Sequence, residues 1–146
     1  PLDHEAVDAI GADSVEGDLS RLVDSVMSGD PAQLEVEIAG LRSEGLEGIT
    51  LTRALMGRLT LLARLRAEVE AGNGPAAVMA SSGRSLFWKE KDAIGAQLGR
   101  WRAPLLAKAM SRLIEAERQV MSPGGPGVVA ADAELFAICR QAGRLR

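Results

Sequence analysis

Apolar residues recur along most of this chain at the three- and four-residue spacing of amphipathic helices. Between residues 18 and 28, four of them fall at i, i+3, i+4 and i+7 and so line one face: Leu19, Leu22, Val23 and Val26. No stretch alternates apolar and polar residues with the two-residue period of a β-strand. The pattern therefore predicts an all-α fold, with six or seven helices in a single domain.

Glycine and proline mark the ends of the expected helices. In the turn at 29–31, Gly29 suits a left-handed backbone, Asp30 can accept from free amides, and Pro31 fits a first helical turn. The same signals, with a Gly- and Pro-rich loop at 122–127, define the remaining boundaries. They predict a short helix over 3–10, a linker over 11–17, and helices over 18–28, 31–44, 51–71, 75–82, 87–99, 105–121 and 130–142.

The strongest apolar stripes lie on the helices expected at 51–71 and 105–121, which should build the core. Their inward positions are Leu51, Leu55, Leu59, Leu62, Leu65, Leu106, Met110, Leu113 and Val120. The arginines of the first helix are expected on its solvated remainder: Arg53, Arg58, Arg64 and Arg66. Trp101, at a helix junction, and Cys139, a small apolar residue, are both expected in the core.

Composition agrees with packed helices. Hydrophobic residues make up 47% of the 146 residues but aromatic residues only 3%, and tyrosine is absent, whereas sheets enrich aromatic residues. The single cysteine cannot form an internal disulfide, which favours a reducing, cytoplasmic location. No apolar run reaches 18 residues and no basic leader opens the chain, so we expect no membrane span and no signal peptide. Because the chain begins with Pro1 rather than Met, we expect a fragment of a longer protein.

The net charge of −3 conceals two oppositely charged parts. Residues 1–48 carry twelve acids and two arginines, whereas residues 49–146 carry eight acids and fifteen lysines or arginines. An acidic total argues against a nucleic-acid partner, but the basic part of the chain does not.

The sequence predicts no catalytic residue, no metal site and no cofactor. His4 is the only histidine and Cys139 the only cysteine, so neither a transition-metal cage nor a Cys–His nucleophile pair can be assembled. A phosphate-binding GxxxxGK[ST] segment is also absent. Acids cluster at residues 3–8 and 115–117, where their spacing is typical of helix starts and solvated faces.

The segment 86–120 combines three of the four aromatic residues with seven cations and only four acids. Within and just before it, the predicted nucleic-acid or interface contacts are Arg84, Trp88, Lys89 and Lys91. An aromatic residue at a rim can stack on an unpaired base while neighbouring cations meet phosphates. It can equally anchor a protein interface or belong to the core, and for Trp88 all three interpretations stay open.

Three motifs occur in an order that resembles a known family. The first is a G-D-S…L-x-x-L-V-D…G-D run, formed by Gly11, Asp13, Ser14, Leu19, Leu22, Val23, Asp24, Gly29 and Asp30. The second, an aromatic pair followed by K-x-x-D, is Phe87, Trp88, Lys89 and Asp92. The third, L-x-x-A-E-R-x-x-K, is Leu113, Ala116, Glu117 and Arg118, with Val120-Met121 in place of the usual lysine near its end. Spanning nearly the whole chain, they resemble the C-terminal part of the delta subunit of the bacterial DNA polymerase III clamp loader.

The resemblance implies a domain organisation and a set of partners. Residues 1–13 would end an upstream AAA+ lid domain, and residues 14–146 would form the helical collar, which packs against the other loader subunits in a ring. The domain would be non-catalytic, although its parent complex belongs to a nucleotidyltransferase. It would act in DNA replication, and primer–template DNA is a further expected contact.

Two other functional classes remain as alternatives. The first is an unrelated all-α protein-interaction module, which would not assemble with loader subunits. The second is a small enzyme with a carboxylate site inside a helical bundle, which would require two or more acids buried together in a pocket.

Overall fold

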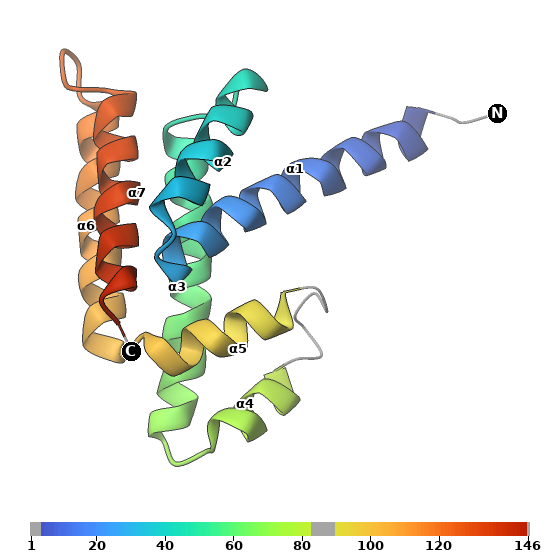
Figure 1. Cartoon of the computed structure of the whole chain (residues 1–146), viewed down its shortest axis with the longest axis vertical. Coiled ribbons are helices and arrows are strands. Elements are labelled where there is room, and N and C mark those ends of the chain that lie inside the picture. The colour runs from blue at the N-terminus through green and yellow to red at the C-terminus, as the bar shows by residue number, and fades with distance from the viewer. Residues whose placement is uncertain (1–3, 83–89, 146) are drawn as a thin grey trace.

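The computed structural model describes the backbone of residues 4–82 and 90–145, and the side chains of residues 15–81 and 90–145. All regular secondary structure in these ranges is helical (Figure 1). The seven helices are α1 (His4–Ser28), α2 (Pro31–Ser43), α3 (Ile49–Glu70), α4 (Pro75–Ser82), α5 (Lys91–Arg100), α6 (Ala103–Met121) and α7 (Val128–Gly143). The prediction of an all-α domain with six or seven helices is confirmed.

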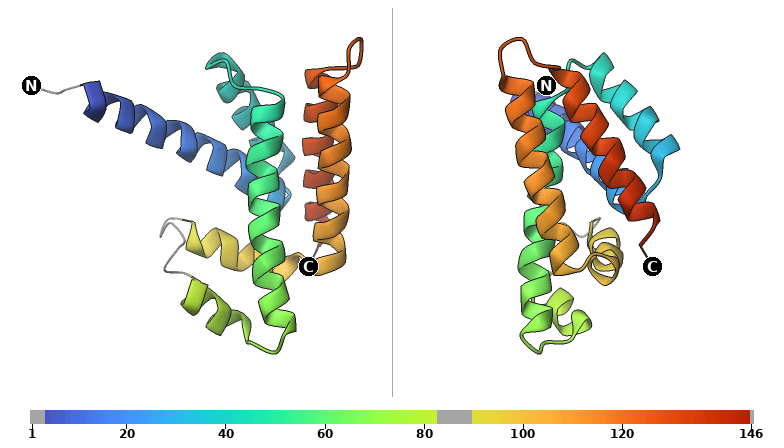
Figure 2. Two further views of the ribbon diagram at one scale, coloured as in Figure 1. Left: turned by 180° about the vertical axis from the view of Figure 1, so that it is seen from behind. Right: turned by 90° about the vertical axis from the view of Figure 1, so that its left-hand side faces the viewer.

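Helix α3 is the central element, because it contacts every other helix except α2. Helices α6 and α7 form an antiparallel hairpin along one side of α3, and α1 packs across both α3 and α7 before α2 turns back along α1 (Figures 1 and 2). Helices α4 and α5 pack against the far end of α3. The first and last helices of the chain are therefore in direct contact, since α1 packs on α7.

The core consists of the leucine stripes that periodicity predicts. All five predicted leucines of α3 are fully buried, as are Leu22 and Val26 of α1 and Leu135 of α7. In α6, Leu106 and Leu113 are buried, whereas Met110 and Val120 are partly exposed. Each buried leucine stabilises the fold by roughly 1.5–3 kcal/mol relative to an exposed one.

The turn between α1 and α2 has the predicted chemistry. Gly29 adopts φ +79°, the Asp30 side chain accepts from the amide of Gln33 at 3.1 Å, and Pro31 begins α2. Gly29 also lies directly against α7, because a Cβ atom there would be 2.4 Å from the backbone nitrogen of Gly143. The glycine is therefore required both by its conformation and by the close approach of α7.

The prediction of a linker at 11–17 is wrong, because α1 is one continuous helix of 25 residues that includes Gly11 and Gly17. A helix-interior glycine costs only about 1 kcal/mol relative to alanine, while each added residue continues the hydrogen-bonded ladder. The boundary drawn between residues 13 and 14 falls inside α1. The assignment of residues 1–13 to a preceding domain stays a prediction.

Two expectations for α3 are also wrong. The helix begins at Ile49 with Gly48 as its N-cap, two residues before the expected start at residue 51. Arg58 and Arg66, expected in solvent, are both only 7% exposed, because α3 is covered by neighbours on most of its surface. The helix expected at 87–99 corresponds to α5, and its expected start at Phe87 lies outside the described residues.

No helix in the described part of the chain is long and apolar enough to cross a membrane.

Candidate functional site

Only one of the four predicted contact residues can be placed. Arg84, Trp88 and Lys89 lie outside the described residues, and so do the side chains of His4 and of the acids at 3–8. Lys91 is the first residue of α5 and is half-buried. It lines an open groove of about 430 Å³ between α4 and α5, together with Met79, Ala80, Asp92, Gly95 and Ala96.

The two predicted core residues are confirmed. Trp101 is 1% exposed, and its indole Nε1 donates to the backbone oxygen of Met27 at 3.1 Å. Cys139 is fully buried beside the carbonyl of Ser25. Burial raises the pKa of the Cys139 thiol, and the negative charge of Asp30 raises it further. The thiol is therefore held in its unreactive, protonated form.

A buried polar network joins three helices where α1, α3 and α5 meet. Arg58 of α3 donates through Nη1 to the Asp24 carboxylate at 2.6 Å and to the Gln97 side-chain oxygen at 2.9 Å. Gln97 in turn donates through Nε2 to the same Asp24 oxygen at 3.0 Å. The arginine, the carboxylate and the amide thus form a closed triangle with one corner on each helix.

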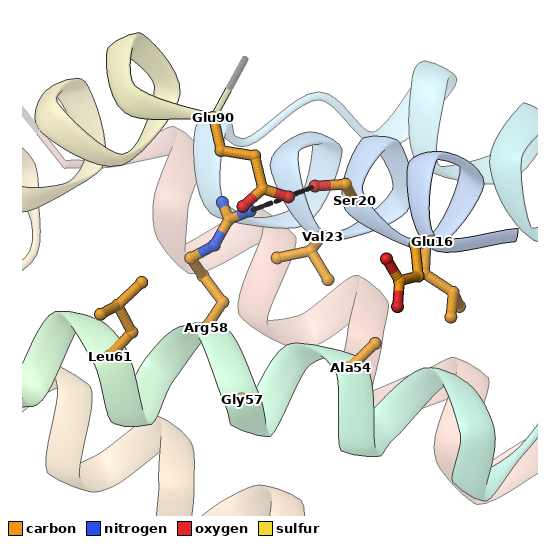
Figure 3. Close-up of a pocket in the computed structure, with 9 residues that line it drawn as sticks. Glu16, Ser20, Val23, Ala54, Gly57, Arg58, Leu61 and Glu90 are labelled. Atoms are coloured by element: carbon orange, nitrogen blue, oxygen red, sulfur yellow. Dashed lines mark hydrogen bonds and ion pairs between the residues drawn. The ribbon is translucent and has the colours of Figure 1, made fainter. Parts of the chain in front are cut away.

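The network extends to the residue that precedes α5. The hydroxyl of Ser20 on α1 donates to the Glu90 carboxylate, and Arg58 Nη2 lies 3.9 Å from the same carboxylate oxygen (Figure 3). Arg58 therefore faces two acids, Asp24 and Glu90, each with about a third of its side chain exposed. A buried guanidinium is tolerated only with such partners, so the network fixes α5 relative to α1 and α3.

A groove of about 320 Å³ opens beside this network, between α1 and α3 (Figure 3). Its lining combines apolar side chains with one glycine, one hydroxyl and three charged groups: Leu19, Val23, Ala54, Leu61, Gly57, Ser20, Glu16, Arg58 and Glu90. The guanidinium of Arg58 points toward Glu90 and Ser20 across the groove (Figure 3). Apolar walls with few charged groups suit the docking of a side chain or a helix rather than acid–base chemistry.

A second candidate surface lies on the outer side of α6. Ile114 is 55% exposed and Met121 is 68% exposed, and their spacing of seven positions, close to two helical turns, places both on the same side of the helix. Arg118 lies one turn from each on this face, with its guanidinium 3.3 Å from the Glu115 carboxylate. Large apolar side chains grouped with arginine are typical of the rim and centre of protein interfaces.

Among the described side chains, no group of three or more His, Cys, Asp or Glu residues is placed to hold a metal ion. The acids that line the groove between α1 and α3 are Glu16 and Glu90, and Glu90 pairs with Arg58 as the neighbouring Asp24 does. Glu117, expected on a solvated face, instead accepts a hydrogen bond from the hydroxyl of the buried Thr52 at 3.1 Å.

No family model, curated protein or solved structure matches this chain. The resemblance to the delta subunit therefore rests on the three motifs alone.

The buried arginine network was missed by sequence reasoning, although a signal for it exists. Arg58 and Arg66 fall within the same stripe as Leu55, Leu59 and Leu62, at helical spacings that point inward rather than outward. An arginine in an apolar stripe indicates a buried cation that needs an acidic partner. The identity of that partner, Asp24, could not be read from the sequence because 34 residues separate the two.

Proposed function

We propose that this chain is the C-terminal collar domain of a clamp-loader delta subunit, which packs beside other loader subunits while the sliding clamp is loaded onto primed DNA in replication. The observation that carries the proposal is the order of three delta-like motifs along one all-helical chain. The domain itself is non-catalytic in this proposal and needs no cofactor.

The first motif has a defined role in the packing of the domain, which supports its use as a marker of this fold. Asp24 holds the buried Arg58, Gly29 allows α7 to approach, and Asp30 caps α2. Leu22 and Val23 of the same motif are buried in the core. A collar domain needs this rigid joint because its helices must present fixed surfaces to two neighbours.

The outer side of α6 is the surface that we assign to a neighbouring subunit. Ile114 and Met121 expose apolar area that gains nothing in water, and burying it against a partner is favourable by about 25 cal/mol per Å². The salt-bridged Arg118 and Glu115 supply polar contacts at the edge of this surface.

The proposed contact with primer–template DNA belongs to the predicted set Arg84, Trp88, Lys89 and Lys91. Lys91 lies at the start of α5, where the positive end of the helix dipole also favours a phosphate. If Trp88 stacks on a base, Trp88→Ala should weaken DNA binding by the reconstituted loader about fivefold to a hundredfold, the loss of one stacked base. Unchanged DNA binding would remove Trp88 from the proposal.

Assembly with purified loader subunits from the same organism tests the main proposal. The chain should enter a complex with them, measured by analytical ultracentrifugation. The double variant Ile114→Lys/Met121→Lys should lose this assembly, because it places two cations in the apolar surface. Val36→Lys is the matched control, since Val36 on α2 is 63% exposed but lies outside the α6 surface.

Each outcome of the assembly experiment decides a different point. If the unaltered chain joins no loader subunit, the delta assignment fails and an unrelated interaction module becomes the better description. If the chain assembles but the α6 double variant does so equally well, the assignment stands and the α6 surface is wrong.

A further inference from the structure

The groove between α1 and α3 has apolar side chains in its lining and is left open by the chain's own described residues. Leu19, Ala54 and Leu61 are only partly buried although they pack against the core, so their outer sides line the groove. Val23 is 3% exposed and closes the floor. A space of about 320 Å³ accommodates one or two large apolar side chains from another molecule.

Gly57 keeps the groove open at its centre. It lies in the interior of α3, and a Cβ atom built there would meet no atom within 4 Å. A glycine at such a position costs about 1 kcal/mol relative to alanine. Packing within the described chain does not require it, since a side chain would fit. Close approach by a second molecule would require it, because any side chain at 57 projects into the groove.

The charged groups at the groove select for a cationic partner. Glu16 has no hydrogen-bond or ion-pair partner among the described residues, and Glu90 is about a third exposed. Among the described residues, the one cation in the lining is Arg58, which is bound to Asp24 and Gln97 and also lies 3.9 Å from the Glu90 carboxylate. Arg53 and Arg64 lie on the outer stripe of α3 that contains Gly57, but they do not line the groove. The described part of the lining therefore presents one carboxylate without a partner, Glu16, and a second, Glu90, that Arg58 neutralises only in part.

We propose that this groove is a docking site for an amphipathic helix of a partner protein, with a large apolar side chain over Gly57 and a lysine or arginine against Glu16. A helix fits because the groove runs between two helices. The ridge of side chains on a third helix can pack into such a groove. This surface is separate from the outer side of α6, and the inference does not rest on the delta assignment.

A synthetic helix tests the inference directly. The probe is a fluorescein-labelled, 18-residue peptide with leucines at i, i+3, i+4 and i+7 spacing and lysines beside the leucine face. Its comparison peptide carries glutamate in place of every lysine. Fluorescence anisotropy should show saturable binding of the lysine peptide to the whole chain. The glutamate peptide should bind at least about tenfold more weakly, because its charges meet Glu16 and Glu90.

Three variants locate the binding to the groove. Gly57→Leu fills the groove and should weaken peptide binding about tenfold or more. Glu16→Lys should weaken it about twofold to fivefold, with a smaller dependence on salt. Gly40→Leu is the matched control, because Gly40 on α2 is also a helical glycine with nothing within 4 Å. It should leave binding unchanged, and thermal denaturation should show that all three variants fold.

Other outcomes would overturn the inference. Absence of binding by the lysine peptide excludes a helix-docking groove of this charge, and equal binding to Gly57→Leu places the peptide elsewhere. If the chain self-associates in sedimentation and Gly57→Leu abolishes this, the occupant is a second copy of the chain rather than a partner protein.

Discussion

Arg58 shows at the scale of a single residue how this fold accommodates a charge in its interior. Its guanidinium donates to Asp24 from α1 and to Gln97 from α5, so these two hydrogen bonds reach different helices, and Glu90 lies 3.9 Å away as a further ionic partner. Buried charges are costly unless they are paired and hydrogen-bonded. The buried Arg58 side chain therefore restricts the position of α5, because movement of α5 away from α1 would leave the guanidinium without its hydrogen-bond acceptors.

Asp24→Ala should destabilise the chain by about 2–3 kcal/mol. The cost is below that of a fully buried pair because Asp24 is itself about a third exposed and Gln97 remains in place. Urea denaturation followed by circular dichroism measures the change. The control is Glu35→Ala on the exposed face of α2, which should stay within about 0.5 kcal/mol of the unaltered chain. Equal effects of the two substitutions would show that Arg58 does not depend on Asp24.

Cys139 should be unreactive in the folded chain. Because burial raises the pKa of its thiol above the ordinary value of 9.0, the unfolded thiol ionises at a lower pH than the folded one. The free energy of unfolding should therefore fall as the pH rises above about 9, and Cys139→Ala should remove that part of the pH dependence. Labelling with a thiol reagent at pH 8 should be slow without denaturant and fast in urea. Rapid labelling of the folded chain would contradict the burial of this residue.

At the scale of elements, the end of α1 is held by hydrogen bonds from two other parts of the chain. The carbonyl groups of the last turn of a helix lack partners within it. Here all four carbonyls at 25–28 accept a hydrogen bond, from donors in the following turn and at the end of α5: the amides of Asp30 and Gly29, Trp101 Nε1 and Arg100 Nη1. The guanidinium of the last residue of α5 and the indole of the residue after it thus bind the carboxyl end of α1 to the end of α5.

Gly29→Ala should destabilise the chain by about 3 kcal/mol. Its positive φ costs about 1–2 kcal/mol for any L-residue, and contact with the Gly143 backbone adds a comparable term. Gly45→Ala is the matched control, because φ is +83° there but no atom lies within 4 Å of the added Cβ. Chemical denaturation of both variants separates the cost of the positive φ from the cost of the contact with Gly143. Equal losses would mean that α7 does not approach α1 as closely as described.

The elements that could be predicted from sequence are those whose signals are local. The leucines of α3 and the turn at Gly29 each depend on spacing or on residues next to one another. The linker at 11–17 failed because two glycines lower helix stability without ending a helix that is already formed. The prediction that Arg58 is exposed failed for another reason, because its burial depends on helices that are distant in the sequence.

At the scale of the whole molecule, the candidate site was harder to predict than the fold. The groove depends on Glu16 of α1, Gly57 of α3 and Glu90 before α5 being brought together by tertiary packing. No motif spans such separations, so the sequence indicated an aromatic and cationic segment but not this groove. Of the predicted contact residues only Lys91 is placed, half-buried on α5, and the interpretations of Trp88 stay open.

The arrangement of the helices predicts unequal stability across the molecule. Helix α3 contacts five helices, whereas α4, within the described residues, contacts only α3 and α5 and buries little more than Val78. Regions with few buried contacts open locally at a lower free energy than the core. In native-state hydrogen exchange, the amides of α4 should therefore exchange faster than those of α3 and α6. Gly29→Ala should accelerate exchange in α3 and α6, which open with global unfolding, but leave α4 unchanged. Uniform acceleration in all three helices would show that α4 opens only when the whole chain unfolds.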